Sequence, residues 1–146
     1  MKTVVLQLIA SFFGALGFSL IFNVEKKNLL PCALGGVAVW AAYLFSANVL
    51  LWGDLLSAAV SAAVCQLVAE ALARILKAPT TTFCIPSLVP LIPGGSLYRT
   101  MDAIILRDWE QFRLSGSATL QIAFGIAIGL SFVSGFLFIL RRKKRA

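Results

Sequence analysis

Long runs of apolar residues, separated by only short polar breaks, constrain this chain more than any other feature. Several runs reach about 20 residues, the length that an α-helix needs to cross the hydrocarbon core of a membrane. Hydrophobic residues make up 60% of the sequence and charged residues 13%, and so few charges could not cover a water-soluble domain of this size. The sequence therefore predicts an all-α integral membrane protein.

Five membrane spans are expected in a single membrane domain covering residues 1–146. The first is expected to be retained rather than cleaved as a signal peptide, because its apolar run is long. The dipeptide Gly53-Asp54 is the only break expected between the second and third spans, which predicts an antiparallel helix pair. The third span is rich in alanine and serine, so we expect it inside the bundle. The expected spans are 3–22, 29–52, 55–76, 82–98 and 117–140.

A short amphipathic stretch follows the fourth span, at residues 99–113. Apolar residues recur there at helical spacing, and charged residues fill much of the other side. Tyr98 and Trp109 flank the stretch with side chains typical of headgroup depth. We expect a short interfacial helix, with the polar end of the fourth span as the alternative.

The distribution of basic residues predicts the orientation, because basic residues gather on the cytoplasmic side of membrane proteins. The net charge is +7, and five of the thirteen basic residues form a run at the C-terminus. This pattern is more typical of a topology anchor than of a nucleic-acid contact. With the C-terminus in the cytoplasm and the N-terminus outside, nine of the thirteen are cytoplasmic: Lys26, Lys27, Arg74, Lys77 and residues 141–145.

The fourth span contains the sharpest functional signal. Pro86, Pro90 and Pro93 each remove a backbone donor from a helix, and Gly94-Gly95 adds backbone freedom. Together they predict a helix that breaks near Pro93. Unpaired backbone at membrane depth is tolerated where protein or a water-filled cavity surrounds it, and transporters use such breaks to bind ligands. The alternative is a kink that only shapes packing.

A second half-helix that starts near Ser96 would point its first amides at a cavity, and that end of a helix favours a carboxylate. The hydroxyls of Ser96 and Tyr98 and the charge of Arg99 are candidate contacts. Arg99 has an alternative role as a surface charge paired with Asp102, three residues along. We therefore predict that the substrate pathway includes Pro90, Pro93, Gly94, Gly95, Ser96, Tyr98 and Arg99.

Three further polar residues lie in or beside apolar spans, where such residues are functional candidates. Gln66 lies deep in the third span and is expected to bridge helices or to contact substrate. Glu70 is a candidate for proton coupling, as is Asp102, but an ion pair between Glu70 and Arg74 at i+4 explains it equally. Asn23 ends the first span, where it is expected to cap the helix or to line the pathway.

Residues that carry catalysis or bind metals are scarce in this sequence. It has no histidine, which removes the commonest general base and the commonest zinc ligand. Cys32, Cys65 and Cys84 lie in apolar segments without a CxxC pair, so they are expected to be small core residues. Phosphate-loop and GxSxG motifs are absent from the sequence. We predict a non-enzymatic protein without a cofactor or metal.

Two stretches resemble the bacterial threonine/serine exporter family. They are "GFSLIFNVEKKNLLPCALGG" at 17–36 and "PSLVPLIPGGSLYRTM" at 86–101. In that family a Phe-Asn ends the first span and a Pro-Gly-x-x-x-Tyr follows the broken span. The matching residues here are Phe22-Asn23, Pro93-Gly94 and Tyr98. A proline that often follows Asn-Val in the family is replaced by Glu25.

The resemblance implies a function and a partner. The chain looks like the small subunit of two-subunit members, which corresponds to the C-terminal membrane half of single-chain members. It implies a larger partner with a cytoplasmic domain and its own spans, in the bacterial cytoplasmic membrane. It also implies export of small polar metabolites that carry carboxylates, such as threonine, serine or succinate. The alternative is an accessory subunit that only scaffolds its partner, and a membrane enzyme is the least favoured reading.

Overall fold

The computed structural model describes residues 2–143, with side chains described for residues 2–140. Every regular element in this range is a helix, which confirms the predicted all-α class. Of the basic run at 141–145, residues 144 and 145 lie outside the described range. The elements are α1 (Lys2–Ile21), α2 (Lys26–Asn48), α3 (Asp54–Leu76), α4 (Thr80–Leu88), the 3₁₀ helix η1 (Val89–Leu91), α5 (Gly94–Leu106) and α6 (Trp109–Lys143).

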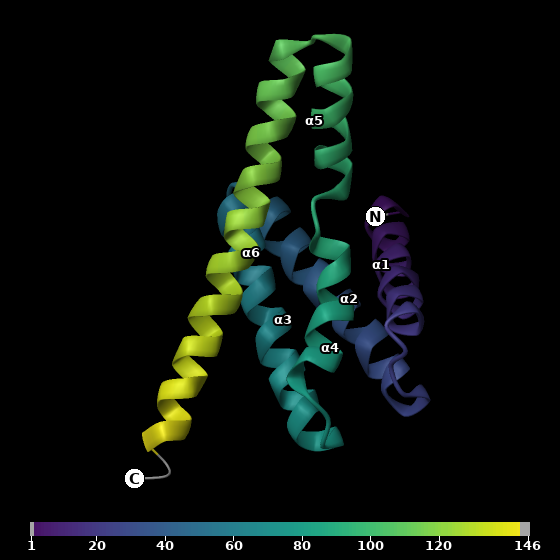
Figure 1. Ribbon diagram of the computed structural model, residues 1–146, viewed down its shortest axis with the longest axis vertical. Helices are drawn as coiled ribbons and strands as arrows, with labels where there is room; N and C mark the ends of the chain where they lie inside the picture. The colour runs from purple at the N-terminus through teal and green to yellow at the C-terminus, as the bar shows by residue number, and fades with distance from the viewer. Residues whose placement is uncertain (1, 144–146) are drawn as a thin grey trace.

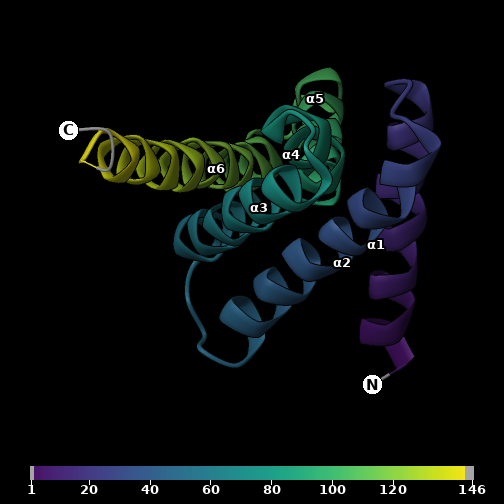
Figure 2. The same ribbon diagram turned by 90° about the horizontal axis from the view of Figure 1, so that it is seen from below.

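The chain runs up and down through five segments, because α4, η1 and α5 follow one another in the same direction (Figure 1). The helices α1, α2, α3 and α6 are long and apolar enough to cross a membrane, whereas Thr80–Leu91 is a shorter apolar helix. α1 packs mainly on α2 at the edge of the bundle, and α3 packs against α2, α4 and α6 (Figure 2). The arrangement agrees with the five expected segments, of which the fourth is composite.

The connection between α2 and α3 is longer than expected. α2 ends at Asn48, and an irregular loop precedes α3, so Gly53-Asp54 is not the only break. The helix stops because the next two amides both bond to the carbonyl of Phe45, at 2.9 and 3.3 Å, and Leu51 adopts a left-handed backbone with φ 54°. The two helices nonetheless pack side by side.

Small residues bring α3 and α6 into close contact. An added Cβ at Gly125 would lie 2.8 Å from the Ala58 Cβ, and one at Gly129 would lie 2.9 Å from the Ala62 Cβ. These glycines form a G-x-x-x-G pair in α6 that packs on the alanine-rich face of α3, the arrangement in which membrane helices approach most closely. The predicted interior position of the third span is thus confirmed.

The fourth segment breaks at Pro93, as predicted. α4 ends at Leu88, η1 follows, and α5 begins directly after Pro93. Earlier in the segment, Pro86 lacks the amide that would bond to the carbonyl of Thr82. That carbonyl instead accepts the thiol of Cys32 on α2, at 3.4 Å. A tertiary contact therefore replaces the hydrogen bond that the proline removes.

The expected interfacial helix at 99–113 is divided between two helices. α5 ends at Leu106, Arg107 adopts a left-handed backbone with φ 56°, and α6 begins at Trp109. The turn forms here because Asp108 caps the new helix: its carboxylate accepts the amide of Gln111 at 3.0 Å. The first part of the stretch continues the fourth segment, and the second part starts the fifth.

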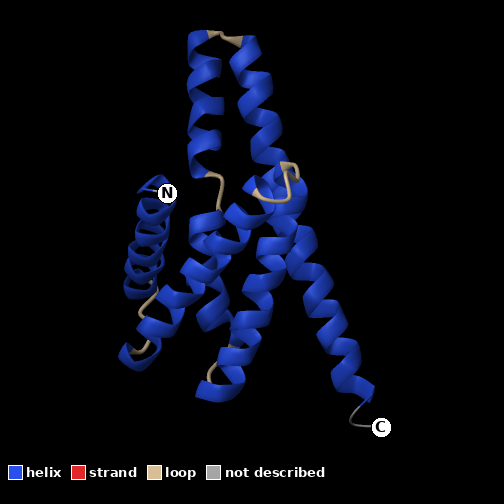
Figure 3. Cartoon of the chain, turned by 180° about the vertical axis from the view of Figure 1, so that it is seen from behind, coloured by secondary structure: helices blue, strands red, loops and turns tan. Residues whose placement is uncertain are grey.

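α5 and the first part of α6 form a hairpin that extends beyond α1, α2 and α3 (Figure 3). With 35 residues, α6 is about 50 Å long at 1.5 Å per residue. This exceeds the thickness of about 30 Å that a bilayer core presents. α6 is therefore longer than a bilayer core is thick, and part of it lies outside the hydrocarbon region.

Candidate functional site

Three cavities follow one another along α1. The Asn28 pocket has a volume of about 390 Å³ and lies where the α1–α2 turn faces α4. The Pro90 cavity, of about 220 Å³, lies between α1, Trp40 and η1. The Thr3 cavity, of about 830 Å³, shares Gln7 and Trp40 with the Pro90 cavity. The three cavities are together called here the α1 groove, and residues of the broken segment line the first two of them.

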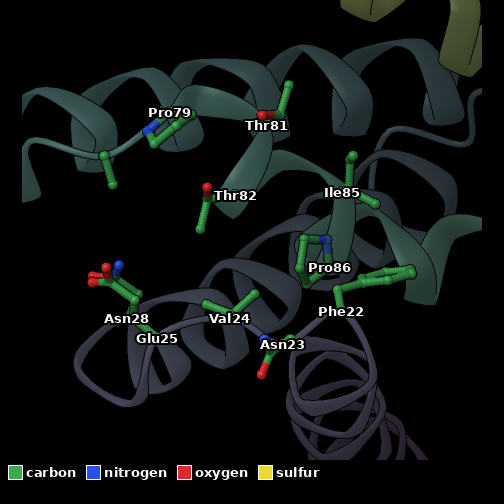
Figure 4. Close-up of a pocket in the computed structure, with 11 residues that line it drawn as sticks. Phe22, Asn23, Val24, Glu25, Asn28, Pro79, Thr81, Thr82, Ile85 and Pro86 are labelled. Atoms are coloured by element: carbon green, nitrogen blue, oxygen red, sulfur yellow. The ribbon is translucent and has the colours of Figure 1, made fainter.

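The Asn28 pocket is built from the α1–α2 turn, the start of α2, the α3–α4 turn and helix α4 (Figure 4). α1 ends where Asn23 takes a left-handed backbone with φ 53°, the geometry expected of a residue that ends a helix. Asn23 also lines the pocket, and its role in a substrate pathway stays a prediction. Lys77 ends α3 in the same backbone conformation, and Pro79 precedes α4. The lining residues are Phe22, Asn23, Val24, Glu25, Asn28, Ala78, Pro79, Thr81, Thr82, Ile85 and Pro86.

Two buried polar atoms in the α1 groove have no protein partner. Asn28 is 1% exposed, and its Oδ1 accepts no hydrogen bond from residues that the structure describes. The indole Nε1 of Trp40 is likewise buried without an acceptor in this range. Buried polar groups in native proteins are normally satisfied by protein, water or ligand. Both atoms belong to residues that line the α1 groove.

Hydrogen bonds from thiol and hydroxyl groups fix the position of α4, which forms one wall of the Asn28 pocket. Ser87 donates its hydroxyl to the carbonyl of Cys32 at 3.0 Å, and Cys65 donates its thiol to the carbonyl of Cys84 at 3.5 Å. All three cysteines are free and buried, so their predicted place in the core is confirmed. Gln66 accepts the thiol of Cys84 at 3.4 Å, so it bridges α3 and α4.

Glu70 forms the expected ion pair on α3. Its Oε1 lies 3.1 Å from the Nε of Arg74, and its Oε2 accepts the hydroxyl of Thr80 at 3.2 Å. Glu70 is 8% exposed, and it is the only charged side chain among the buried residues that the structure describes. The ion pair lies within α3, and the hydrogen bond from Thr80 ties the start of α4 to the end of α3.

The residues at the break lie apart from the cavities. Gly94 and Gly95 are exposed, and an added Cβ at either position would meet no atom within 4 Å. The hydroxyl of Ser96 donates to the carbonyl of Pro93 at 3.1 Å. Tyr98 is 71% exposed. The N-terminal end of α5 is therefore open to its surroundings.

Arg99 and Asp102 are both exposed on α5. The ion pairs in the described part of the chain do not include one between them, so the alternative role of Arg99, a surface pair with Asp102, is not found. The structure thus places the predicted site residues in three regions: Asn23 and Pro90 in the α1 groove, Gln66 and Glu70 on α3, and the rest at the break and on α5.

Sequence reasoning missed Asn28, Trp40 and Thr82. Asn28 follows two lysines in a stretch interpreted as a polar break, whereas α2 already begins at Lys26. Its burial comes from the distant α3–α4 loop, which local sequence does not reveal. Trp40 lies within the second apolar span, where a tryptophan is not distinguished from the other membrane-facing residues. The sequence carries no local signal for these three residues. A signal for helix packing does exist on α6, where two glycines four residues apart predict a close contact with another helix.

The chain was compared with solved structures and with models of known protein families. No solved structure matches the chain. The model of the family described as "Threonine/Serine exporter, ThrE" matches residues 7–136, which include all of the cavities' polar side chains except Thr3. The match covers most of the sequence and agrees with the apolar, membrane-length helices. The chain therefore belongs to the threonine/serine exporter family and is a multi-pass membrane protein of the transport type.

Proposed function

We propose that this chain is a membrane subunit of a secondary exporter for small metabolites that carry a carboxylate, such as threonine, serine or succinate. The α1 groove is its part of the substrate pathway. Membership in the exporter family supports the general activity. The groove supports the location, because Ile85, Pro86 and Pro90 of the broken segment line two of its cavities, and broken membrane helices line the sites of many transporters.

One observation carries this assignment. The two buried polar atoms without protein partners, Asn28 Oδ1 and Trp40 Nε1, both belong to residues of the α1 groove. One atom is an acceptor and the other is a donor. A passing molecule with both donors and acceptors could bind each of them in turn. Elsewhere in the described chain, buried side-chain nitrogen and oxygen atoms have partners.

The break at Pro93 has a supporting role in this proposal. α5 begins there with first-turn amides, and helices present partial positive charge at this end. The amide of Gly94 bonds to the carbonyl of Ile92 at 2.7 Å, while Gly95 carries no side chain that would cover its own amide. We propose that the exposed end of α5 receives the carboxylate beyond the groove, with Ser96, Tyr98 and Arg99 near it.

Replacing Trp40 with phenylalanine is expected to reduce export about tenfold. The change removes the indole donor but keeps an aromatic ring to stack on Tyr43, whose ring centroid lies 5.3 Å away. A hydrogen bond to a charged group is worth roughly 1.5–3 kcal/mol, and 1.4 kcal/mol is about tenfold. Export is measured as the loss of preloaded labelled substrate from cells that express the chain.

Trp52→Phe is the matched control, because Trp52 lies in the α2–α3 loop and is 42% exposed. It should export like the unmodified protein. If Trp40→Phe is present in membranes at the normal level and also exports normally, the α1 groove is not the pathway.

The orientation of the chain is part of the proposal. The loops that border the Asn28 pocket lie at the end of the bundle that carries Lys26, Lys27, Arg74 and Lys77. The positive-inside rule then places this end in the cytoplasm, with the N-terminus outside and the C-terminus inside the bacterial cytoplasmic membrane. The Asn28 pocket would face the compartment from which an exporter takes its substrate.

A larger subunit of the same family is the proposed partner. The α1 groove is bordered by α1 and α2 on one side, and α1 has only small contacts with α4 and η1. Five segments offer few helices to enclose a cavity, so we expect that the chain does not export alone. Co-purification from native membranes should recover a second chain with a cytoplasmic domain and its own spans.

Recovery of this chain as a homogeneous monomer or homo-oligomer that exports on its own would contradict the two-subunit proposal. A complex whose export is unaffected by groove substitutions would favour the alternative, a subunit that only scaffolds its partner. For coupling, we retain Glu70 as the candidate because it is the buried carboxylate of the described chain, whereas Asp102 is exposed.

A further inference from the structure

We propose that the Thr3 cavity holds one acyl chain of a bilayer phospholipid, and that this lipid carries a zwitterionic headgroup. The cavity is the largest of the three in the α1 groove, at about 830 Å³. The inference goes beyond the proposed function and does not depend on export. It requires only that α1 and α2 cross the membrane, as their length and composition indicate.

The first argument is that the cavity is walled by two helices only. Its lining residues come from α1, from α2 and from Val49, which directly follows α2. Figure 2 shows α1 and α2 diverging toward the N-terminal end of α1. Within residues 2–143, α1 contacts α2, α4 and η1 but neither α3 nor α6. The remaining side of the cavity therefore faces the bilayer, whose acyl chains can enter it.

The depth of the cavity matches one leaflet. α1 has 20 residues, or about 30 Å at 1.5 Å per residue, which is the thickness of the hydrocarbon core. The N-terminal end of α1 therefore lies near one membrane surface. On α2 the lining runs from Trp40 to Asn48, eight residue steps or about 12 Å. The cavity thus reaches from that surface through most of the adjacent leaflet, which is about 15 Å deep.

The lining favours an acyl chain over water. Only Thr3, Gln7 and Asn48 among the lining residues have side chains without a large apolar part. Trp40 and Tyr43 stack with their ring centroids 5.3 Å apart, and both belong to the lining. Water in so apolar a space would lack hydrogen-bond partners. The other lining residues are Val4, Leu8, Ala41, Leu44, Phe45, Ala47 and Val49.

The rim of the cavity carries one charge of each sign. Lys2 is exposed and directly precedes the lining residue Thr3. On the α2 side, Asp54 accepts the hydroxyl of the lining residue Tyr43 at 3.3 Å. Neither Lys2 nor Asp54 forms an ion pair with another residue of the described chain. A base and an acid at one rim complement a phosphate and an ammonium, whereas a purely anionic headgroup would be repelled by Asp54.

A lipid in this position would complete the groove. The Thr3 cavity shares Gln7 and Trp40 with the Pro90 cavity. A bound acyl chain would therefore form the missing wall at this end of the α1 groove, on the side that faces the bilayer. The inference assigns that wall to a lipid rather than to a helix of a partner or of a second copy.

The test measures lipid binding to the purified, delipidated full chain by native mass spectrometry. The probes are phosphatidylethanolamine, which is zwitterionic, and phosphatidylglycerol, which is anionic, with identical acyl chains. At the Thr3 cavity we expect phosphatidylethanolamine to bind about fivefold more tightly, the effect of one exposed ion pair. Binding at this site is the part that a substitution in the cavity removes.

Val4→Trp is that substitution, because Val4 lines the cavity and an indole would occupy the space of the chain. It should weaken phosphatidylethanolamine binding at least about tenfold. Val5→Trp is the matched control, since Val5 is the next residue on α1, is 54% exposed and does not line the cavity. It should bind this lipid like the unmodified protein.

Two results would overturn the inference in this assay. One is equal phosphatidylethanolamine binding by the Val4→Trp and Val5→Trp proteins, and the other is phosphatidylglycerol binding at the site as tightly as phosphatidylethanolamine. A photo-crosslinking amino acid at position 4 supplies an independent measurement in native membranes. Crosslinks to phospholipid are expected there, and crosslinks to a second protein chain in place of lipid would contradict the assignment.

Discussion

Replacing Gly129 with leucine is expected to separate α6 from α3 and to lower the free energy of unfolding by about 3 kcal/mol. A Cβ at this position would meet the backbone of Ala59, with its carbonyl carbon at 3.0 Å, and the Ala62 Cβ at 2.9 Å. Backbone atoms inside a helix cannot move aside as a flexible side chain can. The whole of α6 would therefore have to shift. Unfolding in detergent by denaturant titration measures the loss.

Gly135→Leu is the control for this change. Gly135 lies on the same helix, is exposed, and has no atom within 4 Å of an added Cβ. It should unfold like the unmodified chain or be slightly more stable, because glycine is a poor helix former. Equal stability of the two variants would mean that α3 and α6 do not pack as described.

Replacing Gly36 with alanine is expected to widen the α1 groove and to abolish most export. An added Cβ would lie 2.5 Å from the Ala15 Cβ on α1, 3.3 Å from the carbonyl oxygen of Ser11 and 3.5 Å from the Cγ of Pro90. Carbon atoms prefer separations of about 3.5–4.0 Å, so α1 must move by about 1 Å. The steric clash is expected to lower the free energy of unfolding by about 1–3 kcal/mol. The higher helix propensity of alanine offsets about 1 kcal/mol of that loss.

Gly17→Ala provides the comparison, because both changes bring the same gain in helix propensity. Gly17 lies on α1, and an added Cβ there would meet no atom within 4 Å. It should export normally and melt at the same or a slightly higher temperature. Export and melting temperature are measured for both variants. A Gly36→Ala protein with unchanged values would show that α1 and η1 do not meet at this glycine.

The broad fold was predictable because apolar length and proline chemistry act locally. Helix length follows from the runs of apolar residues, and the break at Pro93 follows from the missing amide and the two glycines after it. The position of α3 followed from its alanine and serine content. The end of α5 was missed because Arg107 takes a left-handed backbone, which favours glycine. The cap at Asp108 was the available signal.

The candidate site was less predictable, since its polar atoms are defined by what distant segments cover. Asn28 is buried by a loop about 50 positions further along the chain. Nothing in "EKKNLL" distinguishes its amide from that of an exposed cap. Glu70 could be placed on the same helix face as Arg74, but its bond to Thr80 required the α3–α4 turn.

The thiol of Cys32 has a consequence for how the chain enters the membrane. The stretch Thr80–Leu91 is too short and too rich in proline to insert unaided. Its open carbonyl at Thr82 is closed only by α2. We therefore expect the fourth crossing to settle only after α2 is in place.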